Sequence, residues 1–225
     1  MRKALTGIIL AGGKSQRMGK DKALLPWGNA TLIEHVIKTL QPLVDELIVA
    51  VDDATRFRFL HAQVVEDLLP CAHALGGIYT GLVRASHERC FVCACDMPFV
   101  NPRFVRFLAG ESDNCDIVVP KTTQGFQMLH AIYTKSALET IEAQIHARRW
   151  GLQALVLRVR ARIIEQDTIA IYDPDGASFV NLNSPDDYSR AFAKYQAMAS
   201  MQKHASGING LSRHRQAIPS QEAIG

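Results

Sequence analysis

The residues best suited to chemistry lie in one stretch near the N-terminus, where a glycine pair and several cations follow an apolar run. The run covers residues 5–11 and has the length and β-branched content of a buried strand. Gly12 and Gly13 come next, and because they lack a Cβ they let backbone N–H groups approach a ligand closely. The cations of the following loop include Arg17, Lys20 and Lys22. Backbone donors and fixed positive charge suit a polyphosphate, so the loop is predicted to bind phosphate, with a basic surface loop as the alternative.

The spacing of this loop differs from that of two common phosphate-binding loops. A P-loop has four residues between its glycines and ends in Gly-Lys followed by Ser or Thr. Here Gly13 and Gly19 are separated by five residues, and Lys20 is followed by Asp21, which has no hydroxyl group for magnesium. The G-x-G-x-x-G fingerprint of dinucleotide-binding folds does not match either. The stretch therefore represents another kind of phosphate loop.

Several carboxylates and amides follow other apolar runs. Asp96 comes directly after residues 90–95, and Mg²⁺ prefers such a carboxylate together with phosphate oxygens and retained waters. Asp67 follows residues 63–66, and for both aspartates the alternative is a residue that caps a turn. Asn181 and Asn183 can offer oxygens to a metal or amides to a phosphate, and the alternative for them is a turn before a helix.

The alternation of apolar runs and helical patterns predicts an α/β fold, a single three-layer α/β/α sandwich with a Rossmann-like, mostly parallel sheet. Residues 1–200 are expected to form this domain, and residues 201–225 a disordered tail. In such sheets ligands bind beyond the carboxyl ends of the strands, so the glycine loop, Asp67 and Asp96 should share one edge. Strands are expected at residues 5–11, 46–51, 63–66, 90–95, 116–120, 127–133, 163–165 and 177–180. Helices are expected at residues 32–40, 56–61, 78–86, 102–108, 135–147, 151–157 and 185–198.

Composition limits the partners and the location. The chain has 225 residues, 48% of them hydrophobic, and a net charge of +3, which is too small to favour nucleic acid as the main partner. No apolar run approaches the roughly 18 residues of a membrane span, and the chain leads from Met1 straight into a strand, so we expect a cytoplasmic protein without a membrane partner. Three clustered cysteines, Cys90, Cys93 and Cys95, are expected in the core rather than in a zinc or redox site. The eight histidines are expected at the surface or on helix faces.

Residues 10–22, Leu-Ala-Gly-Gly-x-Ser-x-Arg-Met-Gly-x-Asp-Lys, resemble the signature of the molybdenum cofactor guanylyltransferase family of nucleotidyltransferases. Later segments are similar to further motifs of this family in the same order, and the resemblance covers about residues 5–195. They are Glu-Asp at 66–67, His-Ala-Leu-Gly-Gly at 73–77, Cys-Asp-Met-Pro at 95–98, Gln-Met-Leu-His-Ala at 127–131 and Asn-Leu-Asn-Ser-Pro at 181–185. The segment at residues 73–77 is a loose match, because Ala74 replaces the usual proline and Gly76 replaces the usual alanine.

The resemblance implies roles for individual residues. It implies catalytic roles for Arg17, Lys22 and Asp96, with Mg²⁺ as the cofactor on Asp96. The residues implied in nucleotide binding are Leu10, Ala11, Gly12, Gly13, Lys22, Asp67 and Asp96. Gln127, Asn181 and Asn183 are expected on the pterin side, although a core strand explains the segment around Gln127 nearly as well.

The implied reaction is transfer of GMP from GTP to the terminal phosphate of molybdenum-molybdopterin, with release of pyrophosphate. A phosphate monoester is largely dianionic at pH 7, so it needs no general base, and catalysis reduces to alignment and charge neutralisation. The alternatives are CMP transfer to the same pterin, transfer to a sugar or polyol phosphate, and a non-catalytic nucleotide-binding partner of molybdoenzymes. In the family the sequence of residues 10–13 favours guanine, and molybdoenzyme apoproteins or other cofactor-biosynthesis proteins are further candidate partners.

Overall fold

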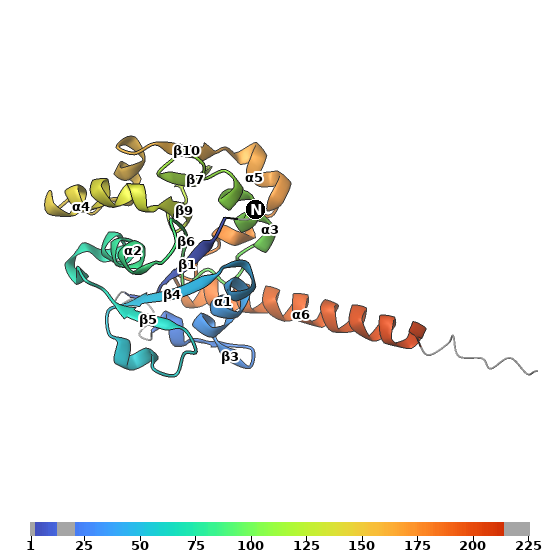
Figure 1. The fold of residues 1–225 in the computed structure, drawn as a ribbon. Coiled ribbons are helices and arrows are strands. Elements are labelled where there is room, and N and C mark those ends of the chain that lie inside the picture. The colour runs from blue at the N-terminus through green and yellow to red at the C-terminus, as the bar shows by residue number, and fades with distance from the viewer. Residues whose placement is uncertain (1–2, 13–20, 214–225) are drawn as a thin grey trace, which may run out of the picture.

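The chain forms one mixed β-sheet with helices on both faces, as the computed structural model of residues 3–12 and 21–213 shows (Figure 1). Side chains are described through residue 201, apart from that of Pro70. The eight strands of this sheet run in the order β10-β7-β9-β6-β1-β4-β5, with β8 paired to β7, and β2 and β3 form a separate hairpin. The strands are β1 (Leu5–Leu10), β2 (Pro26–Trp27), β3 (Ala30–Thr31), β4 (Glu46–Val51), β5 (Gln63–Glu66), β6 (Arg89–Ala94), β7 (Ile117–Thr122), β8 (Gly125–Phe126), β9 (His130–Thr134) and β10 (Ala161–Ile164). The α-helices are α1 (Leu32–Leu40), α2 (His73–Arg84), α3 (Pro102–Gly110), α4 (Leu138–His146), α5 (Gln166–Tyr172) and α6 (Pro185–Arg213).

Strand β1 is buried along its whole length because it lies between two parallel partners, β4 and β6. Ile8 pairs with Ile48 on one side and with Val92 on the other. Helix α2 packs so close to β1 that a Cβ at Gly81 would lie 2.5 Å from Ile8. Short side chains on α2 thus let the helix approach the centre of the sheet.

Two hydrophobic clusters fill the two faces of the sheet. Helices α1 and α3 cover one face, where Ile9 and Phe91 point, and helices α2 and α4 cover the other, where Ile8 and Val92 point. Neighbouring residues of one strand thus serve opposite clusters, as the alternation of a pleated strand requires. The predicted three-layer α/β/α sandwich with a mostly parallel sheet is confirmed, and so is the burial of Cys90, Cys93 and Cys95.

Strand β9 departs from the parallel pattern. It pairs antiparallel with both β6 and β7, so that Cys93 lies opposite His130. Its first residue, rather than its last, therefore lies at the edge where β1, β4 and β6 end. This reversal brings the segment before β9 to the predicted ligand edge.

A third cluster docks the start of α6 against the β2–β3 hairpin and α1. At its centre, the buried ring of Trp27 contacts Phe192 and Tyr195 at centroid distances of 5.5 and 5.2 Å. The helix begins at the predicted position, where the Ser184 N–H donates to Asp187 and the Asp187 N–H donates to the Ser184 hydroxyl. The later part of the helix projects from the body of the protein, as Figure 1 shows.

Helix α6 and helix α2 both differ from their expected lengths. Helix α6 continues through Arg213 instead of ending near residue 198, so the segment expected to be disordered begins as helix, and residues 214–225 lie outside the described part. Helix α2 begins at His73, five residues before the expected start. Gly76 and Gly77 lower the helix propensity of its first turn. A Cβ at Gly76 would lie 2.5 Å from the carbonyl oxygen of Leu69, which explains the glycine.

The expectation of a strand at residues 177–180 is wrong. This segment forms a short 3₁₀ helix, Ala177–Phe179, which follows Gly176 at a φ of 59°. The N–H of Ser178 donates to the carboxylate of Asp173, and its hydroxyl accepts from the N–H of Asn101, so local polar groups replace a strand partner. Helix α5 was not expected, and the strand expected at residues 127–133 begins only at His130.

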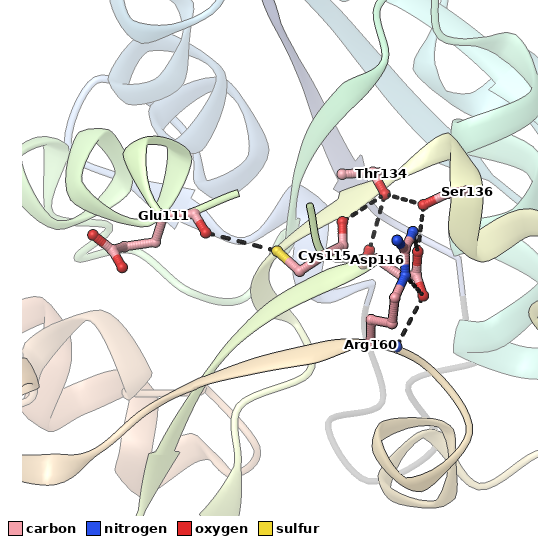
Figure 2. A network of polar contacts seen from close by, with 6 residues as sticks. All are labelled: Glu111, Cys115, Asp116, Thr134, Ser136 and Arg160. Carbon is pink, nitrogen blue, oxygen red and sulfur yellow. Dashed lines mark hydrogen bonds and ion pairs between the residues drawn. The ribbon is translucent and has the colours of Figure 1, made fainter. Parts of the chain in front are cut away.

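At the opposite edge of the sheet, Asp116 joins β7, β9 and β10 through a polar network (Figure 2). Its carboxylate accepts from the Arg160 guanidinium at 2.6 Å, from the Arg160 N–H at 2.8 Å and from the Ser136 hydroxyl. The hydroxyl of Thr134 donates to the carbonyl oxygens of Cys115 and Asp116. Hydrogen bonds from Arg160 above all, and then from Ser136, hold the pKa of Asp116 at about 2.

Replacing Asp116 by Asn should change how the free energy of unfolding depends on pH below about pH 5. The folded-state pKa lies below the ordinary value near 4, so the carboxylate stabilises the fold above about pH 4, and this contribution declines as pH falls towards 2. Between pH 5 and pH 3 the wild-type protein should lose about 1 kcal/mol more than Asp116→Asn. Urea unfolding at pH 5, 4 and 3 measures the difference, with Asp175→Asn at an exposed turn as the control. Parallel pH profiles for wild type and Asp116→Asn would contradict it.

The docked and projecting parts of α6 should respond differently to truncation of a side chain. Phe192→Ala removes a ring that packs on Trp27 and should lower the free energy of unfolding by about 2 kcal/mol. Met198→Ala, two turns further along, removes a side chain from a residue that is 46% exposed and should change stability by less than about 0.5 kcal/mol. Chemical denaturation of both variants makes the comparison. Equal losses would show that the helix packs on the domain well beyond Tyr195.

Candidate functional site

The carboxyl ends of β1, β4 and β6 meet at one edge, where the chain leaves β1 for the glycine pair. The N–H of Cys95 donates to the carbonyl oxygen of Leu10 at 3.0 Å, and the N–H of Ala11 donates to that of Ala50 at 2.9 Å. Leu10 and Ala11 are buried, whereas Gly12 is exposed. A Cβ at Gly12 would make only an ordinary contact, 3.4 Å from the N atom of Asp52, so the fold itself leaves room for a side chain there. Packing within the fold therefore does not by itself require a glycine at this position.

Two predicted site residues, Gly13 and Arg17, lie outside the described residues, and the chain re-enters at Asp21. Asp21 caps the 3₁₀ helix η1, Lys22–Leu24, because its carboxylate accepts from the N–H of Ala23 at 3.0 Å. Its carboxylate also forms an ion pair with Arg56, which lies in η3, Ala54–Phe57, after β4. Sequence reasoning missed this pair because residues 35 positions apart with ordinary charges carry no spacing signal.

Lys22 lies at the centre of the site. Its Nζ atom donates to Oδ2 of Asp96 at 2.8 Å and to Oδ1 of Asn183 at 2.8 Å. The side chains of Lys22 and Asp96 are only 19% and 15% exposed, so the ion pair is partly withdrawn from solvent. Three segments that are far apart in the sequence thus meet at one ammonium group.

The segments that carry Asp96 and Asn183 are tied together by their backbones. The N–H of Leu182 donates to the carbonyl oxygen of Asp96 at 3.1 Å, and the buried Leu182 side chain belongs to the cluster around Trp27. After Asp96, the carbonyl oxygen of Pro98 lies 2.9 Å from Nε2 of His35 on α1. Burial lowers the pKa of His35. Packing on both sides therefore fixes the turn that presents Asp96.

The other predicted residues have different surroundings. Asp67 accepts from the N–H of Leu69 and from the hydroxyl of Thr80, both at 2.9 Å, as expected for a residue that caps a turn. Gln127 reaches the same sheet edge through the reversal at β9, and its amide donates to the Thr122 hydroxyl at 2.9 Å. Asn181 donates to the carbonyl oxygen of Phe179 at 3.2 Å. The structure therefore brings Asn183, but neither Asn181 nor Gln127, into hydrogen-bond contact with Lys22.

The expectation that all histidines lie at the surface or on helix faces is wrong for His130. Its ring is fully buried on β9, stacked on Phe104 at 5.7 Å and edge-on to Phe91 and Phe179 at 5.0 and 5.4 Å. Burial lowers the pKa of His130 to about 3, so the ring is neutral at physiological pH. Its place in an apolar alternating run, between Leu129 and Ala131, was the signal available in the sequence.

The donor set of this edge suits a hard cation bound together with phosphates. Asp96 supplies a carboxylate and Asn183 an amide oxygen, next to the ammonium group of Lys22. Within the described residues, no cluster of three or more His, Cys, Asp or Glu side chains could cage a metal, so a cation here would draw other ligands from water and phosphate oxygens. Mg²⁺ binds proteins in this way. In the same part of the chain, no helix combines the length and the apolar character that a membrane span needs.

Comparison with known proteins identifies relatives over most of the chain. Residues 7–164 match the MobA-like NTP transferase domain. The chain is 34% identical over 196 residues to the molybdenum cofactor guanylyltransferase of Desulfosudis oleivorans. The aligned region covers 86% of this chain and 97% of that protein. The crystal structure of molybdopterin-guanine dinucleotide biosynthesis protein A from Archaeoglobus fulgidus is similar, with a TM-score of 0.74 and 25% identity, over 87% of this chain and 99% of that one. The manganese complex of Rv0371C from Mycobacterium tuberculosis has the same fold, with a TM-score of 0.60 and 21% identity. The match covers 85% of this chain and 99% of that one.

Proposed function

Because the chain belongs to the family of MobA-like NTP transferase domains, we propose that it transfers GMP from GTP to molybdenum-molybdopterin and releases pyrophosphate. The relative that covers 86% of the chain is a molybdenum cofactor guanylyltransferase. The observation that carries the proposal is the meeting of Lys22, Asp96 and Asn183 at the edge where β1 and β6 end. A phosphate-binding cation and a metal-binding carboxylate are the groups that nucleotidyl transfer requires.

The proposed cofactor is Mg²⁺, held by Asp96. The carboxylate of Asp96 is partly buried and forms an ion pair with Lys22. The amide oxygen of Asn183 accepts from the same ammonium group. A bound Mg²⁺ ion would supply positive charge to the phosphate oxygens of the nucleotide. The manganese complex of a protein with the same fold is consistent with a divalent cation in this kind of domain.

The residues of the chain would then act by position and charge. Lys22 exchanges the carboxylate of Asp96 for phosphate oxygens and offsets the negative charge that develops on the leaving pyrophosphate. Asn183, which accepts from Lys22 in the structure, keeps the ammonium group at this edge during the exchange. The dianionic phosphate of the acceptor attacks the α-phosphorus without a general base. We propose Arg17 as a second cation for the pyrophosphate, and Leu10, Ala11, Gly12, Gly13 and Asp67 as further nucleotide contacts.

The acceptor side is proposed to lie towards β7 and β9. Gln127 and Asn181 lie in the segments before β9 and before α6, and both are only partly buried. Asn183 is proposed to serve the acceptor as well, and its hydrogen bond from Lys22 would link it to the nucleotide phosphates. We further propose a cytoplasmic location, supported by five cysteines that are all free thiols.

The proposed function predicts a preference for GTP. Incubation with molybdenum-molybdopterin, Mg²⁺ and each of the four NTPs should release pyrophosphate from GTP at least tenfold more efficiently than from CTP, about 1.4 kcal/mol of discrimination. The backbone of the loop after β1 is the proposed source of this selectivity. The control omits the pterin, which distinguishes transfer from hydrolysis of the nucleotide. Equal or faster turnover with CTP would reassign the protein as a cytidylyltransferase.

Removal of the metal ligand and of the phosphate ligand should have different effects. Asp96→Asn keeps the shape but loses the charge that a hard cation requires, so turnover should be abolished while GTP binding persists in part. Lys22→Ala should weaken GTP binding as well as turnover, because a phosphate contact acts in the ground state and the transition state. Calorimetry with and without Mg²⁺ and pyrophosphate release measure the two effects, with Lys38→Ala on the exposed face of α1 as the control. Normal turnover by Asp96→Asn would place the metal elsewhere.

A further inference from the structure

The dipeptide Asp21–Lys22 spans the carboxyl end of β1, and its two side chains point to opposite neighbours. In the sheet, β1 lies between β6 and β4. Lys22 reaches Asp96, which follows β6, whereas Asp21 reaches Arg56, in the short helix that follows β4. Consecutive residues are thus anchored on both sides of the strand from which their loop departs.

The anchor on the β4 side is a small ionic cluster around one guanidinium group. Arg56 is paired with Asp21 and also lies 3.7 Å from the carboxylate of Asp52 through its Nη1 atom. Asp52 directly follows β4, and its N atom would lie 3.4 Å from a Cβ at Gly12. The cluster therefore holds Asp21, where the described chain resumes, and includes Asp52, whose backbone lies close to Gly12.

From this geometry we propose that Arg56 is a positioning residue for nucleotide binding, which acts through Asp21 to hold Lys22 in place. The inference rests on the proposed function, because it takes Lys22 as the phosphate ligand. When Lys22 exchanges Asp96 for phosphate oxygens, its ammonium group gives up the ion pair on the β6 side and keeps only the hydrogen bond to Asn183. The Arg56–Asp21 pair holds the backbone from which the Lys22 side chain extends, so it limits where the ammonium group can reach.

The role of Arg56 is positional rather than stabilising. Its side chain is 41% exposed, and exposed ion pairs contribute little to the free energy of unfolding. The cap that Asp21 forms on the N–H of Ala23 does not need Arg56, so η1 should persist without it. Loss of Arg56 should therefore leave the protein folded while widening the range of positions that Lys22 samples.

A double-mutant cycle on nucleotide affinity tests this inference. In the wild-type background, Arg56→Ala should weaken binding of GTP with Mg²⁺ about tenfold, and Arg56→Lys should restore part of the loss. In the Lys22→Ala background, Arg56→Ala should have no further effect, because the group that it positions is gone. Calorimetry of the wild type, Arg56→Ala, Lys22→Ala and the double variant measures the coupling free energy between the two residues in GTP binding. The melting temperature of Arg56→Ala should stay within about 2 °C of the wild type.

Arg58→Ala is the matched control, because it removes another exposed cation from the same turn. It should leave GTP affinity unchanged, whereas an equal loss in Arg58→Ala would reduce the effect to general electrostatics and overturn the proposal. Additive losses in the cycle would also overturn it, since they would show that Arg56 contacts the nucleotide itself or supports the fold. A wild-type protein that binds GTP but releases no pyrophosphate with the pterin would count against the proposed function, and the affinity cycle would still decide the role of Arg56.

Discussion

The ion pair between Lys22 and Asp96 determines how the rest of the site is built. Both groups are largely withdrawn from water, and at such a position each charge needs a partner, because an unpaired charge would incur a desolvation penalty. They satisfy each other in the structure, together with the amide oxygen of Asn183. In the proposed reaction, a nucleotide with a divalent cation would bring the opposite partner for each, phosphate for the ammonium and metal for the carboxylate. Such an exchange would leave each charged group with a partner of opposite charge before and after the nucleotide binds.

This requirement explains why the third cluster around Trp27 is part of the functional architecture. Asn183 can reach Lys22 only if the chain before α6 passes over the end of β6, and the hydrogen bond from Leu182 to Asp96 holds it there. Leu182 is buried in the same cluster as Trp27, and the partly buried aromatic side chains of the first turns of α6 pack against this cluster. The aromatic packing therefore carries no chemistry of its own but sets the position of an amide oxygen at the site.

The sequence predicted those parts of the fold that depend on local patterns. Strands β4 and β5, the Thr31 cap of α1 and the start of α6 lie where periodicity and capping placed them, and the rule that ligands bind at strand ends brought Asp96 to the edge that Lys22 also reaches. Features set by distant contacts could not be predicted in this way. The apolar run at residues 177–180 became a 3₁₀ helix because Asp173 and Asn101 bond to Ser178, and His130 is buried because three phenylalanines from separate segments surround it. The pairing of Asp21 with Arg56 likewise depends on the order of the strands.

The order of the strands also indicates how two substrates could share one edge. Strand β6 lies between β1, β4 and β5 on one side and β9, β7 and β10 on the other, and Asp96 follows β6. The reversal of β9 gives the second side a loop at the same edge, which would otherwise lie at the far end of the sheet. In the proposed reaction the acceptor phosphate and the leaving pyrophosphate must lie on opposite sides of the α-phosphorus. A nucleotide on the β1 side and a pterin on the β9 side would meet this requirement at Asp96, so the topology supplies the alignment on which a reaction without a general base depends.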